Sequence, residues 1–216
     1  MRILFVTQTY PRFAGDTAGP FIRDLALGLA RRGHALTVLL PHAADVAPAW
    51  TENGVVAQSV RYAPEALERI GYGRSLRTDE RLRGLAAATA PLYALAMRRA
   101  LGAMLRGGRF DLVHAHWIVP NGLIATAAAA HTHLAVGLHG SDVFLAERSF
   151  LRPLVKRLLR RTELLTGCSP ELVRRVVALG FEAERSRVIP YGVDADLYHP
   201  DQERRLLWRR RLGLGD

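Results

Sequence analysis

Short apolar segments alternate with amphipathic helical segments along almost the whole chain, and this alternation strongly limits the folds open to it. The strand-like segments are expected at residues 3–7, 35–40, 55–60, 112–114, 134–138, 163–166 and 187–189. Apolar strands separated by helices are typical of a parallel sheet that is buried on both faces. The sequence therefore predicts an α/β fold, in which a doubly wound parallel sheet carries helices on both faces.

The helical segments carry their own start and stop signals. Helices are expected at residues 21–29, 79–106, 121–131, 150–161 and 170–179. Pro20 suits the first turn of the first helix, and Gly33 suits the position just past its end. Ser169 and Gly180 bracket the last helix in the same way, as N-cap and C-terminal glycine. Pro91 is expected to bend or divide the longest helix.

The length and the cysteine content narrow the class of protein. A chain of 216 residues is long enough for one domain with a substantial core. Its single cysteine, Cys168, excludes an internal disulfide and is expected to be a buried structural thiol. The apolar run at residues 3–6 is too short for a signal peptide, and no stretch approaches the ~18 apolar residues of a membrane helix. The sequence therefore favours a cytoplasmic protein.

A net charge of +10 favours anionic partners. Nucleic acid is disfavoured, because neither a recognition helix nor an aromatic stacking platform accompanies the charge. The segment 152–161 has an apolar stripe of Leu154, Val155, Leu158 and Leu159 opposite the basic side chains Lys156, Arg157, Arg160 and Arg161. Such a helix either lies on an anionic membrane, here at its inner face, or packs on the core with its charged face in solvent.

Ligands of doubly wound sheets bind at the carboxyl ends of the strands, so the segments that follow the strands are the candidate sites. After the first strand, residues 7–20 carry Gly15 and Gly19 directly before a helix. Glycines there allow backbone N–H groups to approach an anion at the helix N-terminus. The spacing is not that of a dinucleotide loop, which disfavours a nicotinamide cofactor. A plain connecting loop with turn glycines is the alternative.

The segment 114–122 is the second candidate site. His114 and His116 point the same way if the strand continues, and Trp117 follows them. No Asp, Glu or Cys is placed to complete a metal site, so metal binding is disfavoured. Aromatic surface beside hydrogen-bonding groups favours a pocket for a sugar or an acceptor. For His114 the alternative is a structural histidine that caps the end of the strand.

The segment 138–144 is the third candidate site. His139 stands at the carboxyl end of a strand, and Gly140 allows a ligand to come close. Asp142 either orients the histidine or caps the next helix. A titratable histidine in this place is a functional candidate. A purely structural role for His139 is equally compatible with the residues alone.

Taken together, these motifs resemble the N-terminal domain of the retaining glycosyltransferases of family four (GT4), which have the GT-B architecture. The segments that carry the resemblance are "RILFVTQTYPRFAGDTAGP" near the start, then "FDLVHAHWIVPNG", "LHGSDVF", "CSPELVRRVVALGF" and "VIPYGVDADLYHP". The match covers nearly the whole chain. It implies a Rossmann-like domain, the N-terminal half of a GT-B fold.

The resemblance implies that a hexosyl group passes from a nucleotide-diphosphate sugar to a glycan or glycolipid acceptor with retained configuration. The usual setting is surface polysaccharide or glycolipid synthesis. Gly15 and Gly19 would lie near the donor phosphates and the acceptor, and His139 beside the transferred sugar as the catalytic residue. The other residues implied at the sugar or acceptor pocket are His116, Trp117, Asn121, Gly140 and Asp142. No metal and no other cofactor is implied.

The resemblance also implies a division of the protein. Residues 1–199 would form the acceptor-side domain, and residues 200–216 would lead to a donor-binding domain that this chain lacks. The isolated chain would then be inactive or feeble. Two departures from the family pattern are present, since three residues separate Gly15 from Gly19, and Tyr191 replaces a frequent asparagine. The alternatives are a protein similar to sugar-nucleotide epimerases and a non-catalytic basic module that binds a membrane or another anionic partner.

Overall fold

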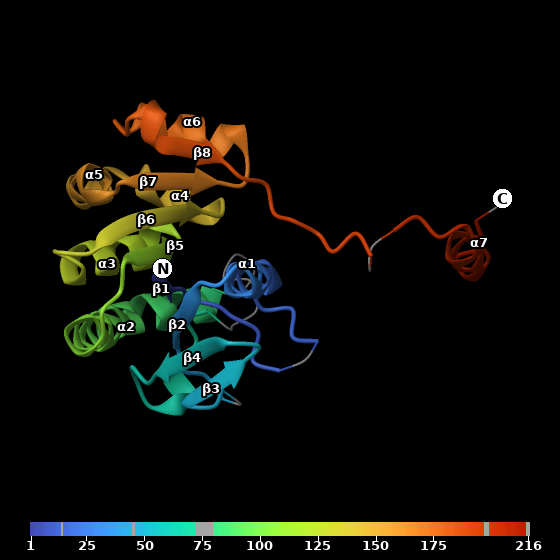
Figure 1. Ribbon diagram of the computed structural model, residues 1–216, viewed down its shortest axis with the longest axis horizontal. Helices are drawn as coiled ribbons and strands as arrows, with labels where there is room; N and C mark the ends of the chain where they lie inside the picture. Colours follow the sequence, from blue (N-terminus) through green and yellow to red (C-terminus); the bar gives the residue numbers. More distant parts are fainter. Residues whose placement is uncertain (14, 45, 72–79, 197–198, 215–216) are drawn as a thin grey trace.

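The computed structural model describes the chain except for residues 14, 45, 72–79, 197–198 and 215–216, and the side chains of residues 80–83. One eight-stranded sheet lies at its centre, in the order β3-β4-β2-β1-β5-β6-β7-β8 (Figure 1). Its strands are β1 (Arg2–Val6), β2 (Ala35–Pro41), β3 (Ala49–Glu52), β4 (Val55–Val60), β5 (Leu112–His116), β6 (His133–Leu138), β7 (Leu164–Gly167) and β8 (Ser186–Val188). All neighbouring strands are parallel except β3 and β4. The α/β fold is therefore confirmed.

Among the strands in the described part of the chain, the edge strand β3 is the one that the sequence analysis missed. It pairs with β4 through a tight turn at Asn53 and Gly54, whose φ angles are 45° and 84°. An Asn-Gly pair between two strands is the strongest short signal of a hairpin, so the signal was present in the sequence. β3 was missed because its four residues alternate between exposed and half-buried and lack the apolar run of the inner strands.

The helices that pack on the sheet mostly follow the predicted segments. They are α1 (Pro20–Arg31), α2 (Glu80–Gly107), α3 (Leu123–Ala128), α4 (Ser141–Ala146), α5 (Arg152–Arg161) and α6 (Pro170–Ala178), with short helical turns η1 (Glu65–Leu67), η2 (Ile118–Gly122), η3 (Ser149–Leu151) and η4 (Ala183–Arg185). Ser169 caps α6 as predicted, since its side chain accepts a hydrogen bond from the backbone N–H of Leu172.

Two of the predicted helices differ in the structure, and α4 lies where no helix was predicted. Pro91 does not divide α2, which runs unbroken because Tyr93, Met97 and Leu101 on its inner face are buried against the sheet. The helix predicted over residues 121–131 is shorter, because residues 118–122 form a separate wide turn, η2, before α3 begins.

The core has two parts, one on each face of the sheet. Side chains of alternating β1 residues point to opposite faces, so Leu4 packs in the cluster with α2, α3 and α5, and Phe5 packs in the cluster with α1. Figure 1 shows α2, α3 and α5 on one side of the sheet and α1 on the other. Among the residues that the structure describes, no helix has both the length and the apolar character to cross a membrane.

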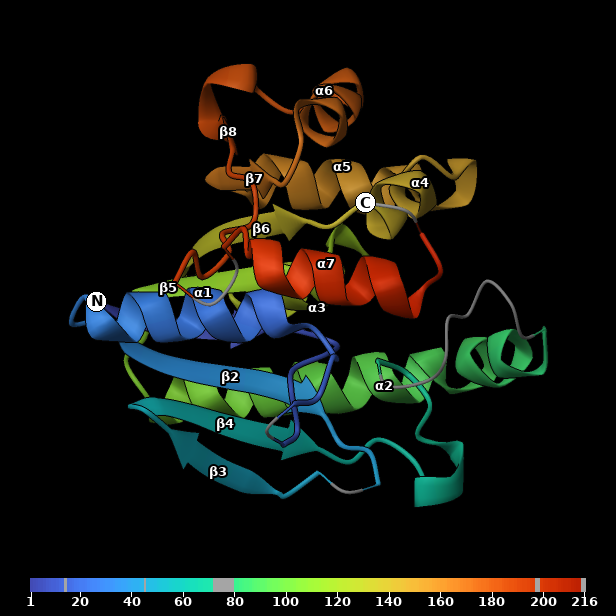
Figure 2. The same ribbon diagram turned by 90° about the vertical axis from the view of Figure 1, so that its right-hand side faces the viewer.

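The C-terminal segment leaves the sheet. Beyond β8 the chain is extended, and a last helix, α7 (Gln202–Arg211), lies apart from the domain at its end (Figure 1). Seen from that side, α7 stands in front of the domain (Figure 2). None of its residues is buried. The segment that the sequence analysis expected to be a connection therefore contains a helix that buries none of its residues.

Candidate functional site

Three histidines meet where β5 and β6 end. Strand β5 extends to His116, so the rings of His114 and His116 lie on the same side, with their centroids 4.3 Å apart. The Nδ1 of His116 lies 3.1 Å from the Nε2 of His139, within hydrogen-bonding distance. Gly137 leaves room for this arrangement, because a Cβ there would lie 3.2–3.4 Å from a ring nitrogen of each histidine.

The ring of His139 is held on its other side by Tyr191. The Nδ1 of His139 and the Tyr191 hydroxyl form a hydrogen bond, although 52 residues separate them in the chain. Tyr191 also stacks on Phe21 of α1, with ring centroids 4.3 Å apart and an interplanar angle of 25°. Trp117 lies against His139 at 4.3 Å. Tyr191 is thus a residue of the site, which the sequence analysis mentioned only as a departure from the family pattern.

Asp142 holds the backbone around His139 and makes no bond to its ring. One carboxylate oxygen accepts the backbone N–H groups of Gly140 at 2.9 Å and His139 at 3.2 Å. The other accepts the N–H of Ile118 at 2.8 Å. Burial raises the pKa of Asp142, although these backbone hydrogen bonds oppose the shift. Asp142 therefore ties the end of β6 to η2, a role that neither predicted alternative described.

Asn121 was predicted to line a sugar or acceptor pocket, but it is buried in the core. Its side chain is fully buried, its Oδ1 accepts from the Tyr93 hydroxyl at 2.6 Å, and its Nδ2 donates to the His116 carbonyl at 2.9 Å. His116 and Trp117 are also buried. The partly exposed residues of the group are His114, whose Nε2 is nevertheless buried, and His139, Tyr191 and Phe21. The sequence had no signal for this difference in depth, because the predicted site residues were all expected to follow strands.

The histidines are neutral at pH 7. Burial lowers the pKa of His114 to about 4 and that of His139 to about 3, where the nearby His114 also contributes. The pKa of His116 lies well below its ordinary value, again mainly because of burial. The site therefore supplies hydrogen bonds and aromatic surface, and its imidazoles carry no positive charge.

The glycine loop, residues 7–20, leads into α1, and α1 contacts the same site. Gly15 and Gly19 have φ angles of 85° and 69°, in the region that favours glycine, and Gly19 directly precedes the first residue of α1. Phe21, two residues further on, lies 5.2 Å from the His139 ring. Asp16 closes the loop on itself, since its carboxylate accepts from the Nε of Arg12 at 2.7 Å and from the backbone of Ala18 at 3.1 Å.

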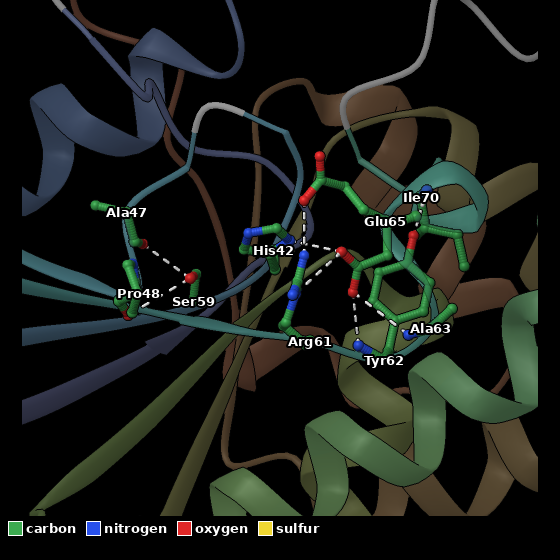
Figure 3. Close-up of polar contacts among 10 residues, drawn as sticks. His42, Ala47, Pro48, Ser59, Arg61, Tyr62, Ala63, Glu65 and Ile70 are labelled. Carbon is green, nitrogen blue, oxygen red and sulfur yellow. Dashed lines mark hydrogen bonds and ion pairs between the residues drawn. The ribbon is translucent and has the colours of Figure 1, made fainter.

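A second polar cluster lies at the carboxyl end of β2 (Figure 3). The buried carboxylate of Glu68 accepts from the Nδ1 of His42 at 2.5 Å and from the backbone N–H groups of Tyr62 at 2.8 Å and Ala63 at 3.3 Å. The Tyr62 hydroxyl accepts from the backbone of Ile70 at 2.8 Å. The strand-end rule could have found His42, but nothing in the sequence pairs it with a glutamate 26 residues away.

The basic helix α5 is partly as predicted. Val155, Leu158 and Leu159 are buried, whereas Leu154 is 52% exposed and does not belong to the buried stripe. Arg161 does not lie on the free basic face, because its guanidinium donates to the carbonyl groups that follow α3, those of Ala129, Ala130 and Thr132. Lys156, Arg157 and Arg160 are exposed. Among the described residues, no group of three or more His, Cys, Asp or Glu is arranged to hold a metal.

Known proteins are similar to this chain in sequence or in fold. The putative teichuronic acid biosynthesis glycosyltransferase TuaC of Bacillus subtilis is 24% identical over 238 residues, which cover 99% of this chain and 55% of that protein. Starch synthase IV of Arabidopsis thaliana, bound to ADP and acarbose, has a TM-score of 0.62 at 14% identity, over 99% of this chain and 59% of that one.

Anabaena HepE in complex with UDP-glucose has a TM-score of 0.57 at 16% identity, over 99% of this chain and 50% of that one. These likenesses to solved structures show a shared fold. The chain spans only 55% of the length of its curated relative, TuaC. The family model for Glycosyltransferase Family 4 matches residues 18–197, which is most of the chain. The chain therefore belongs to glycosyltransferase family 4.

Proposed function

We propose that this chain is the acceptor-side half of a retaining glycosyltransferase, which moves a hexosyl group from a nucleotide-diphosphate sugar to an acceptor hydroxyl. The observation that carries the proposal is the meeting of α1, η2 and the end of β6 around His139, at the carboxyl edge of the sheet. The order of the strands in the sheet changes direction between β1 and β5. Ligands of doubly wound sheets bind at such a point.

The chemistry of this edge suits a sugar. Phe21 and Tyr191 offer partly exposed aromatic faces, and His139 is a neutral hydrogen-bonding group with a pKa of about 3. The N-terminus of α1 would add favourable partial charge for the diphosphate. HepE, which shares the fold, was solved with UDP-glucose, and this supports a nucleotide sugar as the donor. TuaC supports a role in surface polysaccharide synthesis, with a glycan or glycolipid as acceptor. The proposal includes no metal and no other cofactor.

The proposal also divides the protein in two. Residues 1–199 would form the acceptor-side domain, and residues 200–216 would lead to a donor-binding domain. The lengths of TuaC and HepE, about twice the matched region, support this division. Positioning of both substrates in a closed cleft supplies much of the rate of such enzymes. We therefore expect the isolated chain to be feeble as a catalyst.

The test is the substitution His139→Ala in a longer protein that contains this chain, assayed against a panel of UDP- and ADP-sugars. We expect kcat/KM to fall by about 100-fold or more, as for loss of a preorganised hydrogen-bonding group. The control is His131→Ala, at an exposed histidine outside the site. An unchanged rate in His139→Ala would contradict the proposal. Conversion of the free nucleotide sugar without any acceptor would instead identify an epimerase.

One further observation favours a peripheral position on an anionic membrane. The exposed basic residues of α5 lie beside Leu154 and Phe150, which are 52% and 71% exposed. Basic and apolar side chains on one surface are what an anionic bilayer binds. We expect more sedimentation with anionic than with neutral vesicles, and less after Arg157→Glu with Arg160→Glu. The control is Arg31→Glu with Arg32→Glu, at the end of α1. Equal binding to both vesicle types would contradict the membrane role.

A further inference from the structure

A basic groove lies between α2 and α3, on the face of the sheet opposite α1. The two helices pack against each other there (Figure 1). Arg98, Arg99 and Arg106 line a depression of about 420 Å³, together with Gly102 and the alanines at the end of α3. Spacings of three and four residues place these α2 residues on one side of the helix. The groove thus gathers three guanidinium groups among small side chains.

The small residues allow the arginines to come close to one another. Arg106 leans back along α2, because its Nη1 lies 3.4 Å from the place that a Cβ of Gly102 would take. This brings its guanidinium about one turn nearer to Arg98 and Arg99. Ala127 and Ala128 form the facing wall, where no long side chain separates the arginines from α3. A single bound group can therefore be reached from all three arginines.

These arginines have no counterion in the described part of the chain. None of the three is in an ion pair or a hydrogen bond with a residue that the structure describes. Residues 84–110 contain no Asp or Glu, so α2 itself supplies no negative charge beside them. Arg175 of α6 differs, since it is held by Glu147 at 2.5 Å. The groove is a concentration of positive charge that the fold leaves uncompensated.

Structural roles do not account for all three arginines. Arg106 stands in the last turn of α2, where a positive charge complements the helix dipole. Arg98 and Arg99 stand about two turns earlier, and the dipole effect falls off within the last turn. The carbonyl groups that follow α3 are already bound by Arg161 of α5. Arg98 and Arg99 therefore have no role in holding either helix end.

We propose that this groove binds a phosphate or diphosphate group through Arg98, Arg99 and Arg106. Guanidinium groups match pairs of phosphate oxygens and form charge-assisted hydrogen bonds with them. Leu95 lines the same depression and is 43% exposed, so the rest of the ligand meets an apolar wall. The phosphate group belongs either to a soluble compound or to a lipid headgroup.

The groove is separate from the proposed sugar site. Ala127 and Ala128 lie shortly before the start of β6, whereas His139 follows its end. The two sites therefore lie at opposite edges of the sheet. A phosphate group bound in the groove is not that of the sugar donor, and the inference goes beyond the proposed function.

NMR of the arginine side chains, during titration of this polypeptide with pyrophosphate, measures binding in the groove alone. We expect the signals of Arg98, Arg99 and Arg106 to shift. Arg106→Ala should raise the Kd read from the remaining two by at least about tenfold, through loss of charge-assisted hydrogen bonds. The control is Arg31→Ala, which removes the same charge at the end of α1. An equal rise in the control would show unspecific attraction to a basic protein and would overturn the site.

A carboxylate placed in the groove should replace the ligand. Ala127 is exposed, so Ala127→Glu is compatible with the fold and offers the arginines an internal partner. We expect it to abolish the shifts caused by pyrophosphate, whereas the neutral Ala127→Gln should change the Kd by no more than about threefold. Unchanged binding in Ala127→Glu would place pyrophosphate outside the groove and would contradict the proposal.

Sedimentation with vesicles of phosphatidic acid in phosphatidylcholine distinguishes the two sources of the phosphate group. Less sedimentation after Arg98→Ala with Arg99→Ala would identify a lipid headgroup. Pyrophosphate binding without this effect would identify a soluble compound. If pyrophosphate causes no shift, and only Arg157→Glu with Arg160→Glu on α5 reduces sedimentation, the groove binds neither source and the inference is overturned.

Discussion

Two histidine sites lie at the same edge of the sheet, and the groups around their histidines differ. At the ends of β5 and β6, His114, His116 and His139 pack against one another and against aromatic rings, and no carboxylate of the described residues forms a hydrogen bond or ion pair with these three rings. At the end of β2, His42 is paired with the buried carboxylate of Glu68. The first site has only other rings around its histidines, whereas the second pairs its histidine with a buried carboxyl group.

The difference separates the proposed binding surface from a structural clamp. Burial keeps the histidines of the first site neutral, and its outer side chains, His139 and Tyr191, are partly exposed. In the second site both oxygens of Glu68 are used within the protein, so that the segment after β4 is fixed to the end of β2 (Figure 3). Location at the carboxyl edge is thus common to both sites, but only the first presents groups suited to a neutral sugar.

Removal of the Glu68 carboxylate should have the largest effect. Glu68→Ala leaves two backbone N–H groups and His42 without their buried partner, and we expect a loss of about 3–5 kcal/mol in the free energy of unfolding. Urea denaturation measures it. The matched control is Glu163→Ala, because His133 and Glu163 form an exposed pair at 2.6 Å, at the amino end of β6. Its expected cost is about 0–1 kcal/mol. Equal losses would mean that Glu68 is no clamp.

The neutral histidines should make stability depend on pH. Below pH 6.5 the histidines of the unfolded chain become protonated. In the folded chain His114 stays neutral until the pH approaches its pKa of about 4. Stability should therefore fall as pH falls from 6.5 toward 4, by about 1.4 kcal/mol per pH unit for each such histidine.

Urea denaturation at several pH values measures this slope. His114→Gln should reduce it, whereas His131→Gln, at an exposed position, should leave it unchanged. A slope that His114→Gln does not alter would show that His114 is not buried in a neutral form.

A substitution of Asn121 tests whether the hydrogen bonds behind the first site stabilise the fold. Asn121→Ala removes the bonds to Tyr93 and to the His116 carbonyl, and we expect a loss of about 2 kcal/mol in stability. Tyr93→Phe removes only one of these bonds and should cost less. Thermal or urea unfolding provides the measurement. If Asn121→Ala left stability unchanged but abolished acceptor binding, Asn121 would line the pocket after all.

The smallest effect is expected at Gly137. Its lack of a side chain makes room for the three histidine rings at the ends of β5 and β6, and not for the His42 site. A methyl group there would lie 3.2–3.4 Å from the three ring nitrogens, so Gly137→Ala should push these rings apart at a cost of about 1 kcal/mol. The NMR signals of His116 and His139 should shift, and that of His42 should not. A shift of all three would show that the two sites are coupled through β1 and β2.

Local patterns determined much of this protein before any tertiary contact was considered. The alternation of apolar and amphipathic segments predicted the parallel sheet, and residues such as Pro20, Gly33 and Ser169 placed helix ends within a residue or two. The family motifs led to His139 at the edge where the site lies. These properties follow from backbone preferences and periodicity, which act over a few residues.

Only the tertiary structure decided which side chains meet. Tyr191 reaches His139 across 52 residues, and Glu68 reaches His42 across 26. Asn121 turns inward and Arg161 binds the carbonyl groups after α3, although the sequence analysis put one in a pocket and the other on an open basic face. Such pairings depend on strand order, register and the depth at which each residue is packed. They are decided when distant segments come together, and no local pattern encodes them.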